Sequence, residues 1–187
     1  MKYDIIYADP AWSFNNKRTG GSLKSGADAH YKTMSVDEMC ALPVKDITTD
    51  DCILFMWWVA SQPEEAIKLV KAWGFTIKTM TGFNWVKTTK NGKLGFGMGF
   101  WTRALSECCL IATKGKPKRI NAGVRSVVMA ENTKHSRKPQ IFRDQIIKMM
   151  GTLPRLELFA CEKVDGWEAA GYDIDGIDIK TKIEQLR

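Results

Sequence analysis

Apolar residues gather in short runs separated by polar turns, a pattern that predicts strands alternating with helices. Residues 3–8 (YDIIYA) and 52–59 (CILFMWWV) are continuous apolar runs rich in strand-forming residues, as expected of buried strands. Trp57 and Trp58 lie in the second run, where packing is the default interpretation, and the sequence does not say which of them faces a pocket. Three further strands are predicted at residues 75–87 (with a break near Gly82), 108–113 and 156–161.

Helix signals occur between these runs. Ser35 and Glu38 have the spacing of a capping box, which predicts a short helix over residues 39–42 that ends at Pro43. Two longer helices are predicted at residues 61–73, with Ser61 as N-cap and Gly74 as stop, and at residues 140–150, between Pro139 and Gly151. Strands that alternate with helices favour an α/β fold with a parallel, doubly wound sheet.

Length and composition narrow the class of protein. The chain has 187 residues, which predicts a single domain over residues 1–187, and its hydrophobic fraction of 44% is ordinary for a globular protein. No apolar run reaches the roughly 18 residues of a membrane span, and residues 1–4 lead into a strand without a signal-peptide pattern. We therefore expect a cytoplasmic protein without a membrane partner. Five cysteines without C-x-x-C spacing and only two histidines predict neither a disulfide framework nor a metal site.

The charge of the chain favours a polyanionic partner. Its formal net charge is +7, and lysines and arginines are concentrated in residues 114–143. Such a run is either a solvated face or a surface that contacts phosphates. Three of its residues, Lys116, Arg119 and Arg137, are candidates for binding a nucleic-acid substrate.

Two segments could carry chemistry. Asp9-Pro10-Ala11-Trp12 directly follows the first strand, and ligands of open α/β sheets bind beyond the carboxyl ends of strands; the pattern alone is also ordinary turn chemistry. Residues 95–100 are rich in glycine and aromatic residues but lack G-x-G-x-x-G spacing, which predicts a loop rather than a dinucleotide site. With Trp101 and Arg103 after it, this loop suits contact with an extruded base or its flanking strand, although Trp101 could instead pack.

Motifs along most of the chain occur in the order of one known family. Besides residues 9–12, the matching segments are residues 34–39, 54–57, 73–75, 85–88, 107–110 with 114–115, 135–139 and 156–159. They resemble the adenine-N6 methyltransferase family (MT-A type), which includes the catalytic subunit of the eukaryotic messenger-RNA N6-methyladenosine writer and many bacterial and phage DNA methyltransferases. The resemblance implies a Rossmann-like methyltransferase sheet with helices on both faces. Its order would be permuted, with the catalytic motif N-terminal and the cofactor strand C-terminal.

The resemblance also implies roles for individual residues. Asp9 and the Pro10 carbonyl would accept hydrogen bonds from the adenine amine, and Trp12 would stack on the base. The cofactor would be S-adenosylmethionine, which activates the methyl group without a metal. Residues expected to bind the cofactor are Asp9, Lys138, Glu157, Phe159 and Asp173, and those expected to bind the substrate are Trp12, Tyr31, Trp101, Arg103, Lys116, Arg119 and Arg137.

Two residues depart from the family pattern. Ala11 replaces the second proline of the Asp-Pro-Pro-Trp motif, which removes one restriction on the turn. Cys161 stands where the family commonly has an arginine on the cofactor side, so the departure bears on cofactor affinity.

Three functions remain open from the sequence. The leading one is methylation of adenine N6 in DNA, on a base that is flipped out or single-stranded, because a chain without an added zinc-finger or RNA-binding domain resembles the bacterial and phage branch. The same reaction on RNA is the first alternative. The second is a catalytically silent, nucleic-acid-binding subunit, which the intact Asp9 and Trp12 argue against and Cys161 mildly favours. The analogy also suggests a homodimer.

Overall fold

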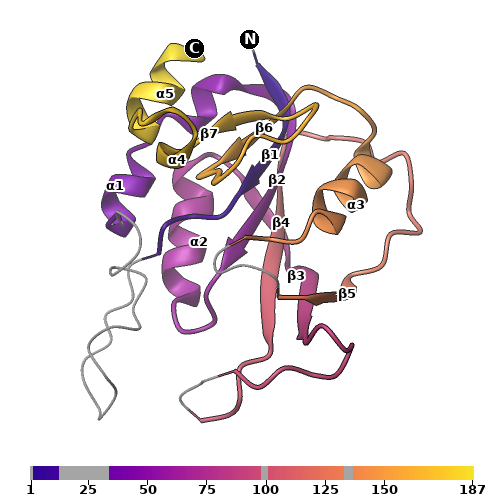
Figure 1. Cartoon of the computed structure of the whole chain (residues 1–187). Helices are drawn as coiled ribbons and strands as arrows, with labels where there is room; N and C mark the ends of the chain where they lie inside the picture. Colours follow the sequence, from indigo (N-terminus) through magenta and orange to yellow (C-terminus); the bar gives the residue numbers. More distant parts are fainter. Residues whose placement is uncertain (1, 13–33, 98–100, 133–136) are drawn as a thin grey trace.

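A mixed sheet forms the centre of the molecule (Figure 1). The computed structural model describes residues 2–12, 34–97, 101–132 and 137–187. Its strands are β1 (Tyr3–Ala8), β2 (Thr48–Trp58), β3 (Thr76–Thr88), β4 (Ser106–Lys114), β5 (Val127–Glu131), β6 (Arg155–Leu158) and β7 (Glu168–Ala170). They form one seven-stranded sheet in the order β5-β3-β4-β2-β1-β6-β7.

Six of these strands run in one direction and β4 runs against them. β1 is parallel to β2 and β6, β6 is parallel to β7, and β3 is parallel to β5, whereas β4 pairs antiparallel with both β2 and β3. The expected parallel arrangement therefore holds for six strands, and β4 departs from it. The described residues between β3 and β4, 89–97 and 101–105, contain no helix, and antiparallel neighbours need no crossover helix between them.

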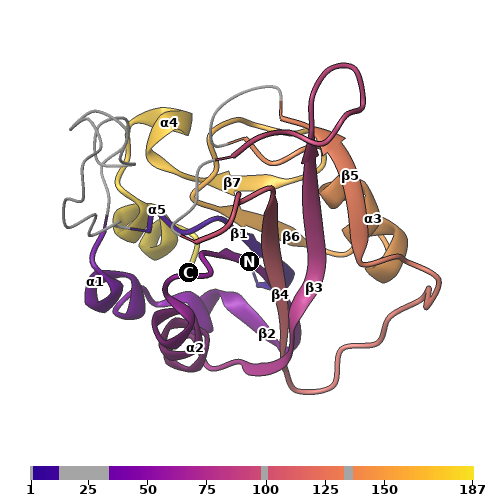
Figure 2. The ribbon, with the colours of Figure 1, turned by 90° about the horizontal axis from the view of Figure 1, so that it is seen from below.

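Helices cover both faces of the sheet, as expected, and Figure 2 shows the layers. The helices are α1 (Val36–Cys40), α2 (Pro63–Ala72), α3 (Ile141–Met150), α4 (Tyr172–Asp175) and α5 (Ile179–Gln185), with a 3-10 turn, η2 (Val44–Ile47). Apolar residues of α1, α2 and α5 pack with Ile6 and Ala8 of β1, whereas those of α3 pack with Ile5 and Tyr7. This alternation along β1 follows from the two-residue period of a strand.

Several boundaries differ from those predicted. The capping box of Ser35 and Glu38 is confirmed, but the N-cap of α2 is Gln62 rather than Ser61. β6 ends at Leu158 because Phe159 has a φ of 60°, which the extended chain cannot accommodate. The sequence did not predict β5, β7, α4 or α5. No helix in the described ranges is long and apolar enough to cross a bilayer.

Candidate active site at the carboxyl edge of the sheet

The sheet directions bring side chains from four strands to one edge. Asp9 directly follows β1, Phe159 follows β6, and Trp57 lies near the end of β2. Because β4 runs against its neighbours, Glu107 near its beginning pairs with Trp85 of β3 and reaches the same edge. We call this side the carboxyl edge and the opposite side the amino edge.

Oppositely charged side chains alternate along the carboxyl edge. The Lys138 ammonium, in the segment before α3, contacts Asp9 Oδ2 and lies 3.4 Å from Glu107 Oε2. Glu107 Oε1 in turn lies 2.5 Å from Lys87 Nζ. These four residues, Lys87, Glu107, Lys138 and Asp9, are called the ion-pair chain below. Only 10% of the Lys138 side chain is exposed, so its charge depends on the two carboxylates for compensation.

Burial and neighbouring charges shift the pKa values in the ion-pair chain in opposite directions. Burial raises the pKa of the Asp9 carboxyl above its ordinary value, although the Lys138 ammonium works in the opposite direction. Burial alone would lower the pKa of Lys138, but Asp9 and Glu107 outweigh it and raise that pKa. The pKa of Glu107 is lowered, since Lys138 and Lys87 together overcome the effect of burial. At neutral pH these directions keep Lys138 charged as a counterion for Asp9.

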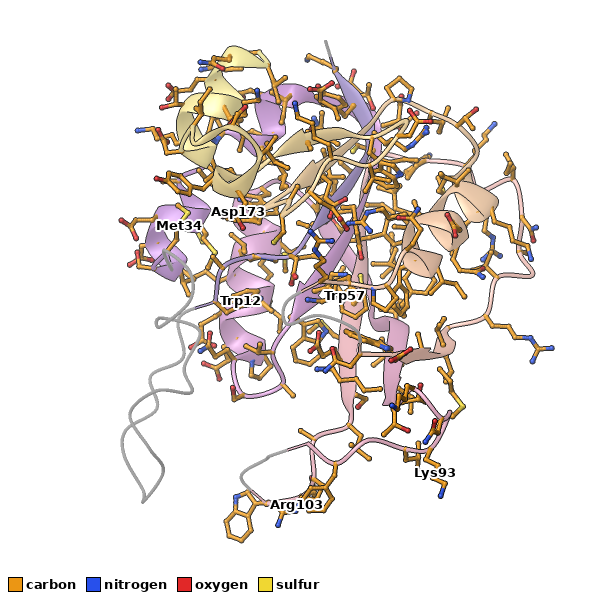
Figure 3. All side chains as sticks on the ribbon, in the orientation of Figure 1. Trp12, Met34, Trp57, Lys93, Arg103 and Asp173 are labelled. Carbon is orange, nitrogen blue, oxygen red and sulfur yellow. The ribbon has the colours of Figure 1, made fainter. Side chains whose placement is uncertain are left out.

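Trp57 connects the ion-pair chain to the core. The Lys138 ammonium lies 5.3 Å from the centre of the Trp57 ring, in a cation–π geometry. Trp57 Nε1–H donates to the hydroxyl of buried Tyr7 at 2.7 Å, and the Trp57 carbonyl accepts from Trp12 Nε1–H at 3.2 Å. Figure 3 shows Trp57 and Trp12 at this edge. The sequence left open which tryptophan of β2 faces a pocket; Trp57 is buried and contacts Lys138 of the ion-pair chain, whereas Trp58 Nε1–H donates to the Met80 carbonyl at 2.9 Å.

The turn after Asp9 is compact. Trp12 N–H donates to the Pro10 carbonyl at 2.8 Å, and the Trp12 side chain is buried, with 5% exposed. A carbonyl oxygen accepts two hydrogen bonds, so Pro10 keeps one acceptor position besides the Trp12 bond. Stacking of a base on Trp12 requires the buried ring to become accessible, and it stays a prediction.

Glu157 lies in a second, buried ion pair. Arg143 of α3 donates from Nε and Nη2 to the two oxygens of Glu157, each at 2.7 Å. Its guanidinium also lies 5.7 Å from the centre of the Tyr7 ring. Burial raises the pKa of Glu157, and Arg143 opposes that rise. Arg143 therefore engages both oxygens of a residue that was predicted to bind the cofactor, and that role stays a prediction.

The chain after β6 approaches Asp9 closely. Asp9 N–H donates to the Leu158 carbonyl at 3.3 Å, and Phe159 is the one non-glycine residue with a positive φ in the described ranges. Strained backbone of this kind occurs often at ligand sites. Cys161 is half-buried, and burial, together with the charges of Asp9 and Asp173, raises its pKa to about 11. Its thiol is therefore neutral where the family commonly has an arginine.

Asp173 lies near the carboxyl edge because the segment before α4 packs closely against the segment after β6. Ala160 N–H donates to the Ala170 carbonyl at 3.1 Å, and a methyl group added to Gly171 would collide with the Ala160 backbone. Asp173 then lies exposed on α4, on the side of the molecule where Figure 3 also shows Trp12. Four of the predicted cofactor residues thus lie near the carboxyl edge of the sheet: Asp9, Lys138, Phe159 and Asp173.

The predicted substrate residues fall into separate groups. Trp101 and Arg103 lie in the connection between β3 and β4, beyond the carboxyl edge, and Arg137 next to Lys138 pairs with Glu162 at 2.6 Å. Lys116 and Arg119 instead follow β4, whose last residue, Lys114, pairs with Cys52 near the beginning of β2. The structure therefore places them at the amino edge and does not bring them to the Asp9 site. Tyr31 lies outside the described residues.

Comparisons with known proteins identify relatives of the chain among methyltransferases. The chain is 35% identical to the Type II methyltransferase M.MunI of Mycoplasma sp. over 98% of its own length and 83% of that protein. It is 28% identical to the N(6)-adenosine-methyltransferase MT-A70-like protein of Arabidopsis thaliana and 26% identical to the human N(6)-adenosine-methyltransferase catalytic subunit METTL3. It covers 94% and 95% of its own length in these two matches but spans only 24% and 29% of the two eukaryotic proteins.

A family model covers nearly the whole chain. The match extends over residues 3–173, from the first residue of β1 into α4, and includes Asp9, Lys138 and Glu157. The α/β sheet with helices on both faces is consistent with a Rossmann-like methyltransferase fold. The chain belongs to the MT-A70 family of methyltransferases.

Proposed function

We propose that the protein transfers the methyl group of S-adenosylmethionine to the N6 amino group of adenine in DNA, on a base that is flipped out or single-stranded. The observation that carries this proposal is the Asp9 carboxylate, which stands at the carboxyl end of β1, an interior strand of the sheet, and is paired with Lys138. Ligands of α/β sheets bind at this end. An ionised carboxylate there is an acceptor for an amine donor.

Asp9 and Pro10 can orient an exocyclic amine. Lys138 contacts Asp9 Oδ2, and a carboxylate has further acceptor positions on its two oxygens. The Pro10 carbonyl adds a second acceptor on the same turn. Two acceptors hold the two N–H groups of adenine N6, so that the nitrogen lone pair can turn out of the ring plane. Preorganised acceptors of this kind typically change rates by about 10²–10³ each.

The donor set fits part of S-adenosylmethionine. The cofactor is a zwitterion with ribose hydroxyls, and the carboxyl edge offers one buried ammonium, Lys138, and one exposed carboxylate, Asp173. We assign Lys138 to the cofactor carboxylate and Asp173 to the cofactor hydroxyls. The strained backbone at Phe159 would form the turn beneath the cofactor. Glu157 fits less well because Arg143 engages both of its oxygens.

The chemistry then needs no further group from the chain. When bound, S-adenosylmethionine supplies a methyl group activated by its sulfonium. The N6 lone pair forms the new C–N bond as the C–S bond breaks, and the electron pair stays with sulfur. Positive charge develops on N6, and the Asp9 carboxylate stabilises it and can accept the proton that N6 loses. Lys138 keeps this carboxylate ionised against the effect of burial.

The ion-pair chain makes activity depend on pH in a defined direction. Asp9 acts as the anion, so kcat/KM should fall as pH decreases through an Asp9 pKa that burial places above the ordinary value. Replacing Lys138 by Met removes the ammonium that opposes burial, so the pKa of Asp9 rises further. We expect the acidic limb of the kcat/KM profile to move to higher pH in Lys138→Met, measured at saturating cofactor.

Lys87→Met is the matched control for this experiment. Lys87 pairs with Glu107 at 2.5 Å, and Glu107 and Lys138 stand between it and Asp9 in the ion-pair chain. This substitution therefore removes one ammonium two ion pairs farther from Asp9 than Lys138 is. Its acidic limb should shift much less than that of Lys138→Met. Equal profiles for the wild type and Lys138→Met would show that Asp9 is not the group whose ionisation limits the rate.

The nature of the product tests the proposal directly. Purified protein is incubated with labelled S-adenosylmethionine and with unmodified DNA or RNA, each single- and double-stranded. The nucleic acid is then digested to nucleosides, and the methylated nucleoside is identified by mass spectrometry. We expect N6-methyldeoxyadenosine. N6-methyladenosine alone would assign the protein to RNA.

Calorimetry with S-adenosylmethionine separates an inactive subunit from an unsuitable substrate. Cofactor binding without product would indicate that the target sequence is absent from the DNA used. Neither binding nor product would overturn the proposal in favour of a silent nucleic-acid-binding subunit.

A further inference from the structure

The connection between β3 and β4 exposes aromatic and basic side chains together. We call the described residues of this connection, 89–97 and 101–105, the arm. Trp101 is 98% exposed and Phe96 is 79% exposed, and the Arg103 guanidinium lies 4.6 Å from the centre of the Phe96 ring. The chain between β3 and β4 has no acidic residue and also carries two exposed lysines, Lys90 and Lys93. Exposed aromatic rings of this size contribute nothing to the core of the isolated chain.

The root of the arm is held firmly. Lys87 N–H donates to the Leu105 carbonyl at 2.8 Å, and Gly95 N–H donates to the Lys87 carbonyl at 3.1 Å. Farther out, the two sides of the arm come close together at Gly97 and Ala104, since a methyl group added to Gly97 would collide with the Ala104 carbonyl. The two described sides of the arm are therefore held against each other near its root.

The arm also begins next to the candidate active site. Lys87, whose backbone holds both sides of the root, directs its ammonium to Glu107 in the ion-pair chain that ends at Asp9. Figure 3 shows Arg103 and Lys93 beyond the end of the sheet where Trp57 and Trp12 lie. A strand that delivers a base to Asp9 can therefore continue along the arm.

We propose that the arm binds the unpaired bases next to the target adenine, with Trp101 as a stacking platform and Arg103, Lys90 and Lys93 as phosphate contacts. The inference rests on the proposed function for the position of the target base. The arm carries only positive charge, so a nucleic-acid strand complements it, and aromatic rings stack on any base. Stacking needs an unpaired base, because the faces of paired bases are covered by their neighbours.

A binding assay tests the arm without catalysis. The fluorescence anisotropy of a labelled twelve-nucleotide oligothymidylate, which contains no adenine, is measured against protein concentration without cofactor. Trp101→Ala should weaken binding by about 5- to 100-fold, the range expected for loss of one stacked base. Trp101→Phe keeps an aromatic platform and should stay within about threefold of the wild type. For a duplex of equal length, the affinities of Trp101→Ala and of the wild type should differ by less than about twofold.

The salt dependence separates stacking from charge. Arg103→Ala should lower the slope of log affinity against log salt concentration by about 0.7 for a single strand, because one phosphate contact is lost. Trp101→Ala should leave this slope unchanged. Lys118→Ala is the matched charge control: Lys118 is exposed and follows β4, away from the arm, and its removal should alter neither slope nor stacking.

Two results would overturn the proposal. One is Trp101→Ala binding oligothymidylate as tightly as the wild type. The other is a change of oligomeric state in Trp101→Ala, measured by light scattering, without a change in oligonucleotide affinity; the arm would then be an interface with another copy of the chain. Methylation of adenine-containing DNA is measured in parallel. A protein that binds oligothymidylate through Trp101 but neither binds S-adenosylmethionine nor methylates DNA would refute the proposed function while leaving arm binding intact.

Discussion

Asp9→Ala is expected to lower kcat for methylation by about 10²- to 10³-fold while the protein remains folded. The substitution removes the acceptor that orients the amine and stabilises its developing charge, and one such contact typically accounts for 10²–10³. The fold should survive because Lys138, which loses Asp9, still lies 3.4 Å from Glu107. Product formation by mass spectrometry and circular dichroism of the same preparation measure the two effects.

Asp50→Ala is the matched control for this substitution. Asp50 is an exposed carboxylate in β2 near the amino edge, so the same charge is lost far from the proposed site. Its kcat should stay within about twofold of the wild type, as for other surface substitutions. Retained activity in Asp9→Ala would exclude Asp9 as the group that orients the amine.

Arg143→Met is expected to lower the free energy of unfolding by about 3–5 kcal/mol. The Arg143 and Glu157 side chains are only 5% and 8% exposed, and loss of one partner leaves the other charge buried without compensation. Urea denaturation followed by circular dichroism measures the change, with the midpoint moving at nearly constant slope. Arg119→Met, a substitution of an exposed arginine, should change stability by less than about 0.5 kcal/mol.

A double variant identifies the source of the loss. In Arg143→Met/Glu157→Leu no uncompensated charge remains, and the free energy of unfolding should recover by at least about 1 kcal/mol relative to Arg143→Met. A double variant that is less stable than Arg143→Met would show that packing of these side chains, rather than an uncompensated charge, determines the cost.

Elements with strong local patterns could be predicted from the sequence. β1 has the predicted bounds, and the capping box at Ser35 marks the beginning of α1, because burial and capping are local signals. β5 and β7 are short, and they exist through their pairing with β3 and β6, which no local pattern encodes. The direction of β4 likewise depends on its antiparallel pairing with β2 and β3, which no local pattern encodes.

The candidate site could be predicted only in part for the same reason. Motif order indicated Asp9 and Lys138, and their contact confirms that the two lie together. Glu107 was part of a matching motif but received no role, because its place beside Lys138 depends on the reversal of β4. Arg143 gave one signal in the sequence: a cation among apolar residues of a helix, flanked by Phe142 and followed by Ile146.

The unequal burial of the tryptophans gives the unaltered protein an optical reporter of the arm. Trp12, Trp57, Trp73, Trp85 and Trp167 are buried and Trp58 is half-buried, whereas Trp101 is 98% exposed. Emission from an indole in water lies at longer wavelength and is open to collision with acrylamide, and a buried indole is shielded from both influences. The red edge of the emission band therefore belongs chiefly to Trp101. Occupancy of the arm can be followed there without attaching a dye.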